Sequence, residues 1–375
     1  MRSPPRRCEF QKAVLVLLEK PGRDSPGDVV SYRPIGLLSI FAKNLERMLC
    51  ARVSWYLHST NFLSTNQFGF TPQRSAEDAV NNLVGYIESN QNKGNVVILI
   101  SIDIKGAFDN AEWSVILKYL FVAGCSVNLF NLVYDYFNDR LVEICIGDSH
   151  GSKGVHKGCI QGSVCGSLFW NVVMNGLLTI DLDEGVQVSA FADDFVMVIG
   201  GSDVLTVERL AASTLDRVVA WGDEVGLTFS EAKTQALCLT RRRVDRPCHL
   251  MKGFTLSYAP SLKILGVVLD ERLNGFKHVD YVCRRMAETA NSLFRVAKPT
   301  WWLSSFMLRW LYLGAIEPVV TYASSVWFHA LEKRCNKVKL DRVQRPMCLR
   351  VCRAYRTVST VADQVLSGLL PIYLR

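Results

Sequence analysis

The chain has 375 residues, of which 49% are hydrophobic and 21% charged, an ordinary globular composition that excludes a disordered chain. No apolar stretch reaches the roughly 20 residues that cross a bilayer, and residues 1–7 carry no signal-peptide pattern. The 12 cysteines form no paired CxxC blocks, which favours reduced thiols over disulfides or a zinc site. We therefore expect an intracellular protein that does not associate with membranes.

The net charge of +8 is distributed unevenly along the chain. Residues 241–375 contain 23 Lys and Arg against 9 Asp and Glu, whereas residues 1–240 contain 20 against 26. A carboxyl-terminal third this basic favours contact with a polyanion such as nucleic acid. Each basic run taken alone is more typical of a solvated surface.

The first third of the chain predicts a strand, a long helix and a second helix, in that order. The apolar run over residues 13–18 predicts a core strand, and residues 40–57 have helical spacing. A segment broken by Gly and Pro over residues 65–75 then precedes a helix that begins near Ala76.

The middle of the chain predicts a buried strand between helices. Residues 95–102 form a continuous run rich in β-branched side chains, which is typical of a strand buried on both faces, and the run ends at Asp103. Helical spacing follows from Asn110 and returns over residues 207–218. Because strands and helices alternate irregularly, we expect an α+β fold rather than repeated βαβ units.

Two adjacent carboxylates, Asp193 and Asp194, interrupt the apolar stretch VSAFADDFVMVIG. The β-favouring runs on either side predict a tight hairpin with both carboxylates in its turn. If this hairpin neighbours the strand that ends at Asp103, three carboxylates meet, and divalent cations would relieve their repulsion. Two such ions about 3.5–4 Å apart would support phosphoryl or nucleotidyl transfer. An isolated Asp-Asp pair is more often a solvated turn.

Further blocks surround these carboxylates in a fixed order. They are YRPI (32–35) with Lys43 and Glu46-Arg47, QFGF (67–70), SIDIKGAFDNAEW (101–113), GCIQGSVCGSLFWN (158–171), FADD (191–194), GLTFSEAKT (226–234) and LKILGVVLD (262–270). In this order the blocks resemble a reverse transcriptase of non-LTR (LINE-type) retrotransposons, and are most similar to the type-1 elements that insert into ribosomal RNA genes.

The resemblance implies a right-hand polymerase, with fingers and palm over residues 1–275 and a truncated helical thumb over residues 276–375. It implies RNA-directed DNA polymerase activity, in which a primer 3′-hydroxyl attacks a dNTP by a two-metal mechanism during target-primed reverse transcription. The implied partners are an RNA template, a DNA primer and dNTPs. The implied cofactors are two Mg²⁺ ions, for which Mn²⁺ can substitute. The implied location is the nucleus, and the chain would be a fragment of a longer element polyprotein.

The resemblance also assigns residues to roles. The catalytic and metal-binding residues would be Asp103, Asp193 and Asp194. The nucleotide-binding residues would be Phe108 beneath the sugar, Gln161 and Gly162 against template and incoming nucleotide, Lys233 near the triphosphate, and Arg33 and Arg74 at phosphate groups. The nucleic-acid contacts would be Leu265 and Gly266 in a primer grip and Lys337, Lys339, Arg342 and Arg345 on a basic thumb helix.

Plainer interpretations and three departures keep an alternative open. Taken alone, Phe108 is typical of a core aromatic, and Lys233 is equally typical of a surface lysine. Ile160 and Ser167 stand where the family usually has proline, and Thr71 stands where a basic residue is common. The alternative is a catalytically degenerate retroelement fragment that only binds nucleic acid. A mobile-intron reverse transcriptase is a weaker possibility, because no maturase-like extension is present.

Overall fold

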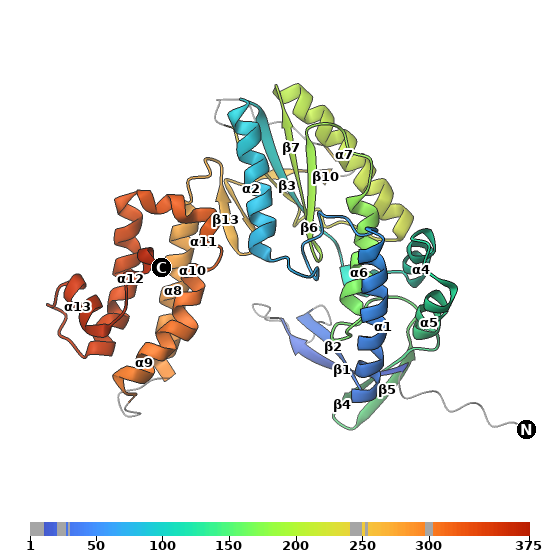
Figure 1. Ribbon diagram of the computed structural model, residues 1–375, viewed down its shortest axis with the longest axis horizontal. Helices are drawn as coiled ribbons and strands as arrows, with labels where there is room; N and C mark the ends of the chain where they lie inside the picture. Colours follow the sequence, from blue (N-terminus) through green and yellow to red (C-terminus); the bar gives the residue numbers. More distant parts are fainter. Residues whose placement is uncertain (1–10, 21–27, 29–30, 241–249, 252–253, 297–302) are drawn as a thin grey trace, which may run out of the picture.

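The computed structural model describes residues 11–20, 28, 31–240, 250–251, 254–296 and 303–375. Its described part combines two larger sheets with helices around them and a group of helices at the carboxyl end (Figure 1). The expected α+β class is therefore confirmed. None of the helices in the described ranges is long and apolar enough to span a bilayer.

The five-stranded sheet has the order β11-β8-β3-β7-β6. Its strands are β3 (Val96–Asp103), β6 (Val186–Phe191), β7 (Asp194–Gly201), β8 (Gln235–Cys238) and β11 (Ser257–Tyr258). Strand β3 lies at its centre and pairs antiparallel with both β7 and β8. The sheet thus places the end of β3 beside the β6–β7 hairpin.

Helices cover both faces of this sheet (Figure 1). On one face, Ile98, Ile100 and Ile102 join the core formed with α6 (Gly166–Leu178) and α7 (Val204–Val225). On the other face, Val97 and Leu99 pack with side chains of α2 (Ala76–Asn92). Successive strand residues point to opposite faces, so two-sided burial explains the continuous apolar run. The predicted buried strand is confirmed.

The four-stranded sheet has the order β2-β1-β4-β5 and differs in its burial. Its strands are β1 (Lys12–Glu19), β2 (Tyr32–Leu38), β4 (Leu141–Ile146) and β5 (Ser149–Gly154). The strand predicted over residues 13–18 exists, but its expected burial is wrong, because Val14, Val16, Leu17 and Leu18 are 38–49% exposed. Only Ala13 on β1 is buried, in a small cluster with Leu38 and Ala42. The sheet therefore joins the rest of the molecule near one end of β1.

Four further helices lie in sequence between strands of the two sheets. They are α1 (Ile40–Ser59), α3 (Ala107–Asn110), α4 (Trp113–Val122) and α5 (Val127–Phe137). Helix α1 begins after Ser39, whose hydroxyl accepts a hydrogen bond from the Ala42 N–H at 3.1 Å. The periodicity predicted this helix, but its apolar stripe is only partly covered. Leu49 is buried, whereas Met48 is 60% exposed.

The carboxyl-terminal part begins with short strands and continues as helices. The strands are β9 (Leu250–Met251), β10 (Phe254–Thr255), β12 (Ser261–Ile264) and β13 (Val267–Asp270). The helical segments are α8 (Phe276–Val296), α9 (Ser305–Leu311), η4 (Tyr312–Ile316), α10 (Glu317–Thr321), α11 (Ser324–Trp327), η5 (Phe328–Glu332), α12 (Arg334–Cys352), α13 (Thr360–Ser367) and η6 (Ile372–Leu374). They share a separate core around Val279, Tyr312 and Leu340. The domain boundary at residue 275 stays a prediction.

Candidate functional site

The three predicted carboxylates meet at one end of the five-stranded sheet. Asp103 is the last residue of β3 and lies opposite Asp194, the first residue of β7. Asp193 lies in the two-residue turn of the hairpin, because Phe191 and Asp194 form the last pair of β6 and β7. The predicted tight hairpin and the predicted convergence of the three residues are present, but Asp194 begins β7 and only Asp193 lies in the turn.

The hairpin turn adopts an uncommon backbone conformation at Ala192, whose φ is 58°. A left-handed conformation costs a non-glycine residue about 1–2 kcal/mol, so neighbouring groups must hold it. The Ala192 N–H donates to Gln67 Oε1 at 3.3 Å, and the Ala192 carbonyl accepts from Trp170 Nε1 at 3.0 Å. These two contacts fix the turn that carries Asp193.

The QFGF block packs directly against this hairpin. The Phe68 N–H donates to the Ala190 carbonyl at 2.8 Å. At Gly69, an added Cβ would lie 2.2 Å from the Ala192 nitrogen, so only glycine permits the approach. The sequence pointed to this block only through a resemblance. Its role at the turn depends on contacts between residues more than one hundred positions apart, for which the sequence has no local signal.

The electrostatics of the site follow from the close approach of like charges. The pKa of Asp194 is raised, first by desolvation of its carboxyl group and then by the charges of Asp193 and Asp103. The Lys233 Nζ lies 3.2 and 3.1 Å from the two oxygens of Asp103. A cationic side chain thus contacts Asp103, and the role of Lys233 near the triphosphate stays a prediction.

A hard divalent cation fits these residues by the chemistry of the donor set. Three carboxylates supply the oxygen ligands that Mg²⁺ prefers, and the mutual repulsion of Asp103, Asp193 and Asp194 is what such a cation relieves. Within the described ranges, no group of three or more His, Cys, Asp and Glu side chains is already arranged to hold a metal ion. Asp103 is instead paired with Lys233.

Phe108 lies five residues after Asp103 and contacts aromatic side chains and the loop that carries Gln161. The Phe108 ring stacks on Trp170 with centroids 5.1 Å apart and meets Phe70 edge-on at 6.2 Å. Its carbonyl accepts a hydrogen bond from the Cys159 N–H at 2.6 Å. Phe108 is therefore half-buried in an aromatic cluster beside the loop that carries Gln161. Its role beneath a sugar stays a prediction.

The loop of Gln161 and Gly162 lies against β2. The Gly36 N–H donates to the Gln161 carbonyl at 2.7 Å. At Gly162, φ is 102° and an added Cβ would lie 2.6 Å from the Gly36 carbonyl oxygen. Glycine is required here both for the backbone conformation and for the close approach.

The two predicted phosphate-binding arginines have different environments. Arg33 is exposed on β2. Arg74 donates through Nη1 to the Thr65 carbonyl, and its guanidinium lies 5.0 Å from the centre of the Phe68 ring. Arg74 thus helps to hold the segment beside the hairpin, and phosphate contact by either arginine stays a prediction.

The predicted primer grip forms the β12–β13 hairpin. Leu265 and Gly266 are its two turn residues, with φ of 46° and 88°. Positive φ at both central residues is the geometry that two-residue hairpins favour. The Tyr322 hydroxyl donates to the Leu265 carbonyl at 2.8 Å, so the turn contacts the helical part of the chain.

The four predicted basic contacts lie on α12, but most of them already have partners. Lys337 lies over the Tyr373 ring at 5.5 Å, and Lys339 pairs with Asp280 at 2.5 Å. Arg345 donates to Thr360 Oγ1 and to the carbonyls of Arg356 and Val358 at 2.6–2.8 Å. Arg342 is exposed. Of the four, Arg342 is best placed to contact a phosphate backbone, and Arg345 mainly holds the segment after α12.

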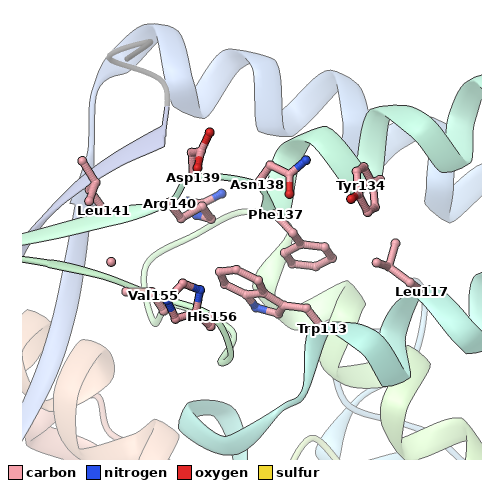
Figure 2. A pocket seen from close by; sticks show the side chains of 11 residues that line it. Trp113, Leu117, Tyr134, Phe137, Asn138, Asp139, Arg140, Leu141, Val155 and His156 are labelled. Atoms are coloured by element: carbon pink, nitrogen blue, oxygen red, sulfur yellow. The ribbon is translucent and has the colours of Figure 1, made fainter. Parts of the chain in front are cut away.

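A separate pocket of about 480 Å³ lies between α4, α5 and the β4–β5 hairpin (Figure 2). Trp113 and Phe137 face each other on its wall, with ring centroids 5.0 Å apart. The pocket contains none of the predicted site residues. The end of the five-stranded sheet, and not this pocket, is therefore the candidate site.

Comparison with known proteins agrees with the geometry. The family model described as "Reverse transcriptase (RNA-dependent DNA polymerase)" matches residues 18–269. The 115 kDa protein in type-1 retrotransposable element R1DM of Drosophila melanogaster is 33% identical over 364 residues, which cover 96% of this chain and 34% of that protein. The Retrovirus-related Pol polyprotein from type-1 retrotransposable element R1 of Bradysia coprophila is 34% identical over 371 residues, which cover 98% of this chain and 36% of that protein.

A solved structure supports the fold. Apo telomerase from Candida tropicalis, truncated from its C-terminal domain, superposes with a TM-score of 0.50 at 12% identity, covering 72% of this chain and 54% of that one. At that identity the likeness concerns the fold alone, and it agrees with the expected α+β polymerase fold. The chain spans about a third of the length of the two curated relatives. Because the family model covers most of the chain, the protein belongs to the reverse transcriptase (RNA-dependent DNA polymerase) family.

Proposed function

We propose that this chain is an RNA-directed DNA polymerase that adds dNTPs to a primer 3′-hydroxyl, with pyrophosphate as the leaving group. The observation that carries the proposal is the meeting of Asp103 with Asp193 and Asp194 at one sheet end, in a chain of the reverse transcriptase family. Two Mg²⁺ ions bound there, or Mn²⁺ in their place, would activate the hydroxyl and stabilise charge on the triphosphate.

The chain's own residues would orient the reactants. Asp103 and Asp193 would be the principal ligands, and Asp194, beside them, would add negative charge and fix the turn. Lys233, now 3.1 Å from Asp103, would move its charge toward the leaving phosphate once Asp103 turns to its ligand role. Phe108 would lie beneath the nucleotide sugar and oppose a 2′-hydroxyl, while Gln161 would contact the template-side base.

The named relatives support a proposal for the biological process, the nucleic-acid partners and the location. Both curated relatives described above come from type-1 retrotransposable elements, so we propose a role in target-primed reverse transcription, with element RNA as template, nicked DNA as primer and the nucleus as location. Residues 1–275 would form fingers and palm, and residues 276–375 the thumb. Arg342 would contact the phosphate backbone, and Leu265 and Gly266 the primer.

A primer-extension assay tests the proposal. We expect the chain to extend a DNA primer on an RNA template in Mg²⁺ and to stop when a chelator removes the metal. Asp193→Asn should abolish extension, because it removes the charge of one ligand. Asp216→Asn is the matched control, since Asp216 is exposed on α7 and lies outside the site.

One observation favours the second candidate, a catalytically degenerate chain that only binds nucleic acid. Asp103 is paired with Lys233, whose charge offsets that of one of the three carboxylates. The same assay separates the candidates. A chain that shifts primed RNA on a gel, yet extends no primer in Mg²⁺ or Mn²⁺, would exclude the polymerase and support the binding protein.

A further inference from the structure

Glu46 on α1 is a buried carboxylate with an unusually complete set of donors. Glu46 is 3% exposed. Oε1 accepts hydrogen bonds from the Tyr136 hydroxyl at 2.6 Å and the Ser163 hydroxyl at 3.0 Å, and Oε2 accepts from the Val164 N–H at 2.7 Å. A carboxylate offers only acceptors, and burying one without partners is strongly unfavourable. The surrounding donors therefore match a carboxylate at this position.

Two of these donors belong to the loop that carries Gln161 and Gly162, and α1 holds that loop at further points. The Cys165 Sγ donates to the Glu46 carbonyl at 3.2 Å. The Cys50 Sγ, one helical turn after Glu46, donates to the Val164 carbonyl at 3.8 Å. Side chains and backbone on one face of α1 thus contact residues 163–165 in succession.

The same loop is held from its other side by β2. The Gln161 carbonyl accepts from the Gly36 N–H at 2.7 Å. At Gly36, an added Cβ would lie 2.2 Å from the Ile160 Cγ2. The loop is therefore enclosed between β2 and α1. Its backbone conformation is fixed even though Ile160 replaces the proline expected from the family pattern.

Arg140 places a positive charge beside the Glu46 carboxylate. The Arg140 Nη2 lies 3.8 Å from Glu46 Oε1, and the Arg140 guanidinium lies 4.2 Å from the centre of the Tyr136 ring. Arg140 is 3% exposed, and its Nε and Nη2 have no hydrogen-bond partner in the described part of the chain. Burial raises the pKa of Tyr136 well above its ordinary range, so this phenol stays protonated and donates to Glu46.

We propose that Glu46 is a positioning residue for DNA synthesis, which fixes the loop of Gln161 and Gly162 against the incoming nucleotide and template. The proposal rests on the proposed polymerase function. Glu46 touches neither substrate nor the three carboxylates. It acts through Ser163 and Val164, and Tyr136 and Arg140 hold its carboxylate in place.

The kinetic test compares variants of Glu46 and Tyr136 in the full chain. Glu46→Ala should raise the dNTP KM about tenfold, because charge-assisted hydrogen bonds to the loop are lost, while kcat changes less. Glu46→Gln should restore most of the wild-type KM, since its amide oxygen can accept from Val164 and its N–H groups can donate to the two hydroxyls. Tyr136→Phe should raise KM about threefold, because it removes the hydroxyl that contacts Glu46 at 2.6 Å and Ser163 at 3.2 Å.

The matched control is Tyr56→Phe. Tyr56 lies on the same helix α1, and its hydroxyl donates to the Ala123 carbonyl at 2.9 Å, away from the loop. This variant should keep the wild-type KM. A difference between the two tyrosine variants therefore reports on the contacts of Tyr136 with Glu46 and Ser163 and not on the loss of a hydroxyl in general.

Hydrogen exchange of the backbone gives a second measurement for variants that fold poorly. Loss of the Val164 hydrogen bond should speed exchange over residues 161–165 in Glu46→Ala, with little change in α7. An unchanged KM and unchanged exchange in Glu46→Ala would overturn the positioning role alone. A wild-type chain that extends no primer would overturn the proposed polymerase, and the positioning role with it.

Discussion

The two sheets of this protein have similar apolar strands but very different surroundings. Leu99 on β3 is completely buried, whereas Leu18 on β1 is 49% exposed. Helices cover both faces of the five-stranded sheet, whereas the buried apolar side chains of the four-stranded sheet form a small cluster around Ala13 and Leu38. The carboxylates lie on the sheet that is covered on both sides. The difference indicates that the three carboxylates lie on the sheet that is packed on both faces, and that the four-stranded sheet leaves apolar side chains exposed to solvent.

The sharpest test of this difference is the same substitution in both sheets. Leu99→Ala should lower the free energy of unfolding by about 2–5 kcal/mol, because it leaves a cavity in a packed core. Leu18→Ala should lower it by less than about 1 kcal/mol, because much of this side chain is already in water. Denaturant unfolding followed by tryptophan fluorescence measures both. Equal effects would contradict the difference in burial.

His278 on α8 is also buried, and its burial makes stability depend on pH. His278 is 1% exposed, and its Nδ1 accepts a hydrogen bond from the Val268 N–H at 3.1 Å. Burial lowers its pKa to about 4 from the ordinary value of 6.5. Below pH 6.5 His278 binds a proton in the unfolded chain but stays neutral in the folded chain. The contribution of neutral His278 to the free energy of unfolding is therefore complete above pH 6.5. It falls by about 3 kcal/mol as the pH is lowered to 4.

Unfolding at a series of pH values checks this prediction against a His278→Gln variant. Glutamine does not titrate, and its side-chain oxygen can accept from Val268. The variant should lose less stability between pH 6.5 and pH 4 than the wild type does. Equal losses would assign the pH dependence to other groups.

The close contact between Gly69 and the carboxylate turn predicts a loss of activity. Gly69→Ala would place a Cβ 2.2 Å from the Ala192 nitrogen, so the turn must shift. A displacement of about 1 Å at a reacting group can reduce the rate by about 10²-fold. Gly85→Ala is the matched control on α2, since its added Cβ meets no atom within 4 Å. Primer extension by both variants is the measurement, and equal activity would exclude a role for Gly69 in holding the turn.

The smallest expected effect concerns the β12–β13 turn. Tyr322→Phe removes the hydrogen bond to the Leu265 carbonyl and should lower the free energy of unfolding by about 1 kcal/mol. If primer contact depends on this turn, the KM for primed template should rise as well. A variant that binds primed template as the wild type does would remove support for a primer grip here.

The sequence predicted those parts of the site that have a local signal. The apolar run before Asp103 and the paired carboxylates between two β-favouring runs predicted both strands and the hairpin. An apolar pattern shows which residues share a face but not what packs against that face. The predicted burial of β1 was therefore wrong, and the exposure of Met48 was not predicted. Glu46 was quoted only as part of a block that carries the resemblance, and its role was not predicted, since its contacts with the loop join residues 117 and 118 positions apart.

Single-nucleotide incorporation by two asparagine variants tests the central claim most directly. Asp103 ends β3 and Asp193 lies in the β6–β7 turn, so the two residues meet only in the folded sheet. We predict that Asp103→Asn and Asp193→Asn each abolish Mg²⁺-dependent incorporation on primed RNA, while Asp216→Asn and the wild type remain active. Full activity in either of the first two variants would contradict a shared catalytic site at the end of the five-stranded sheet.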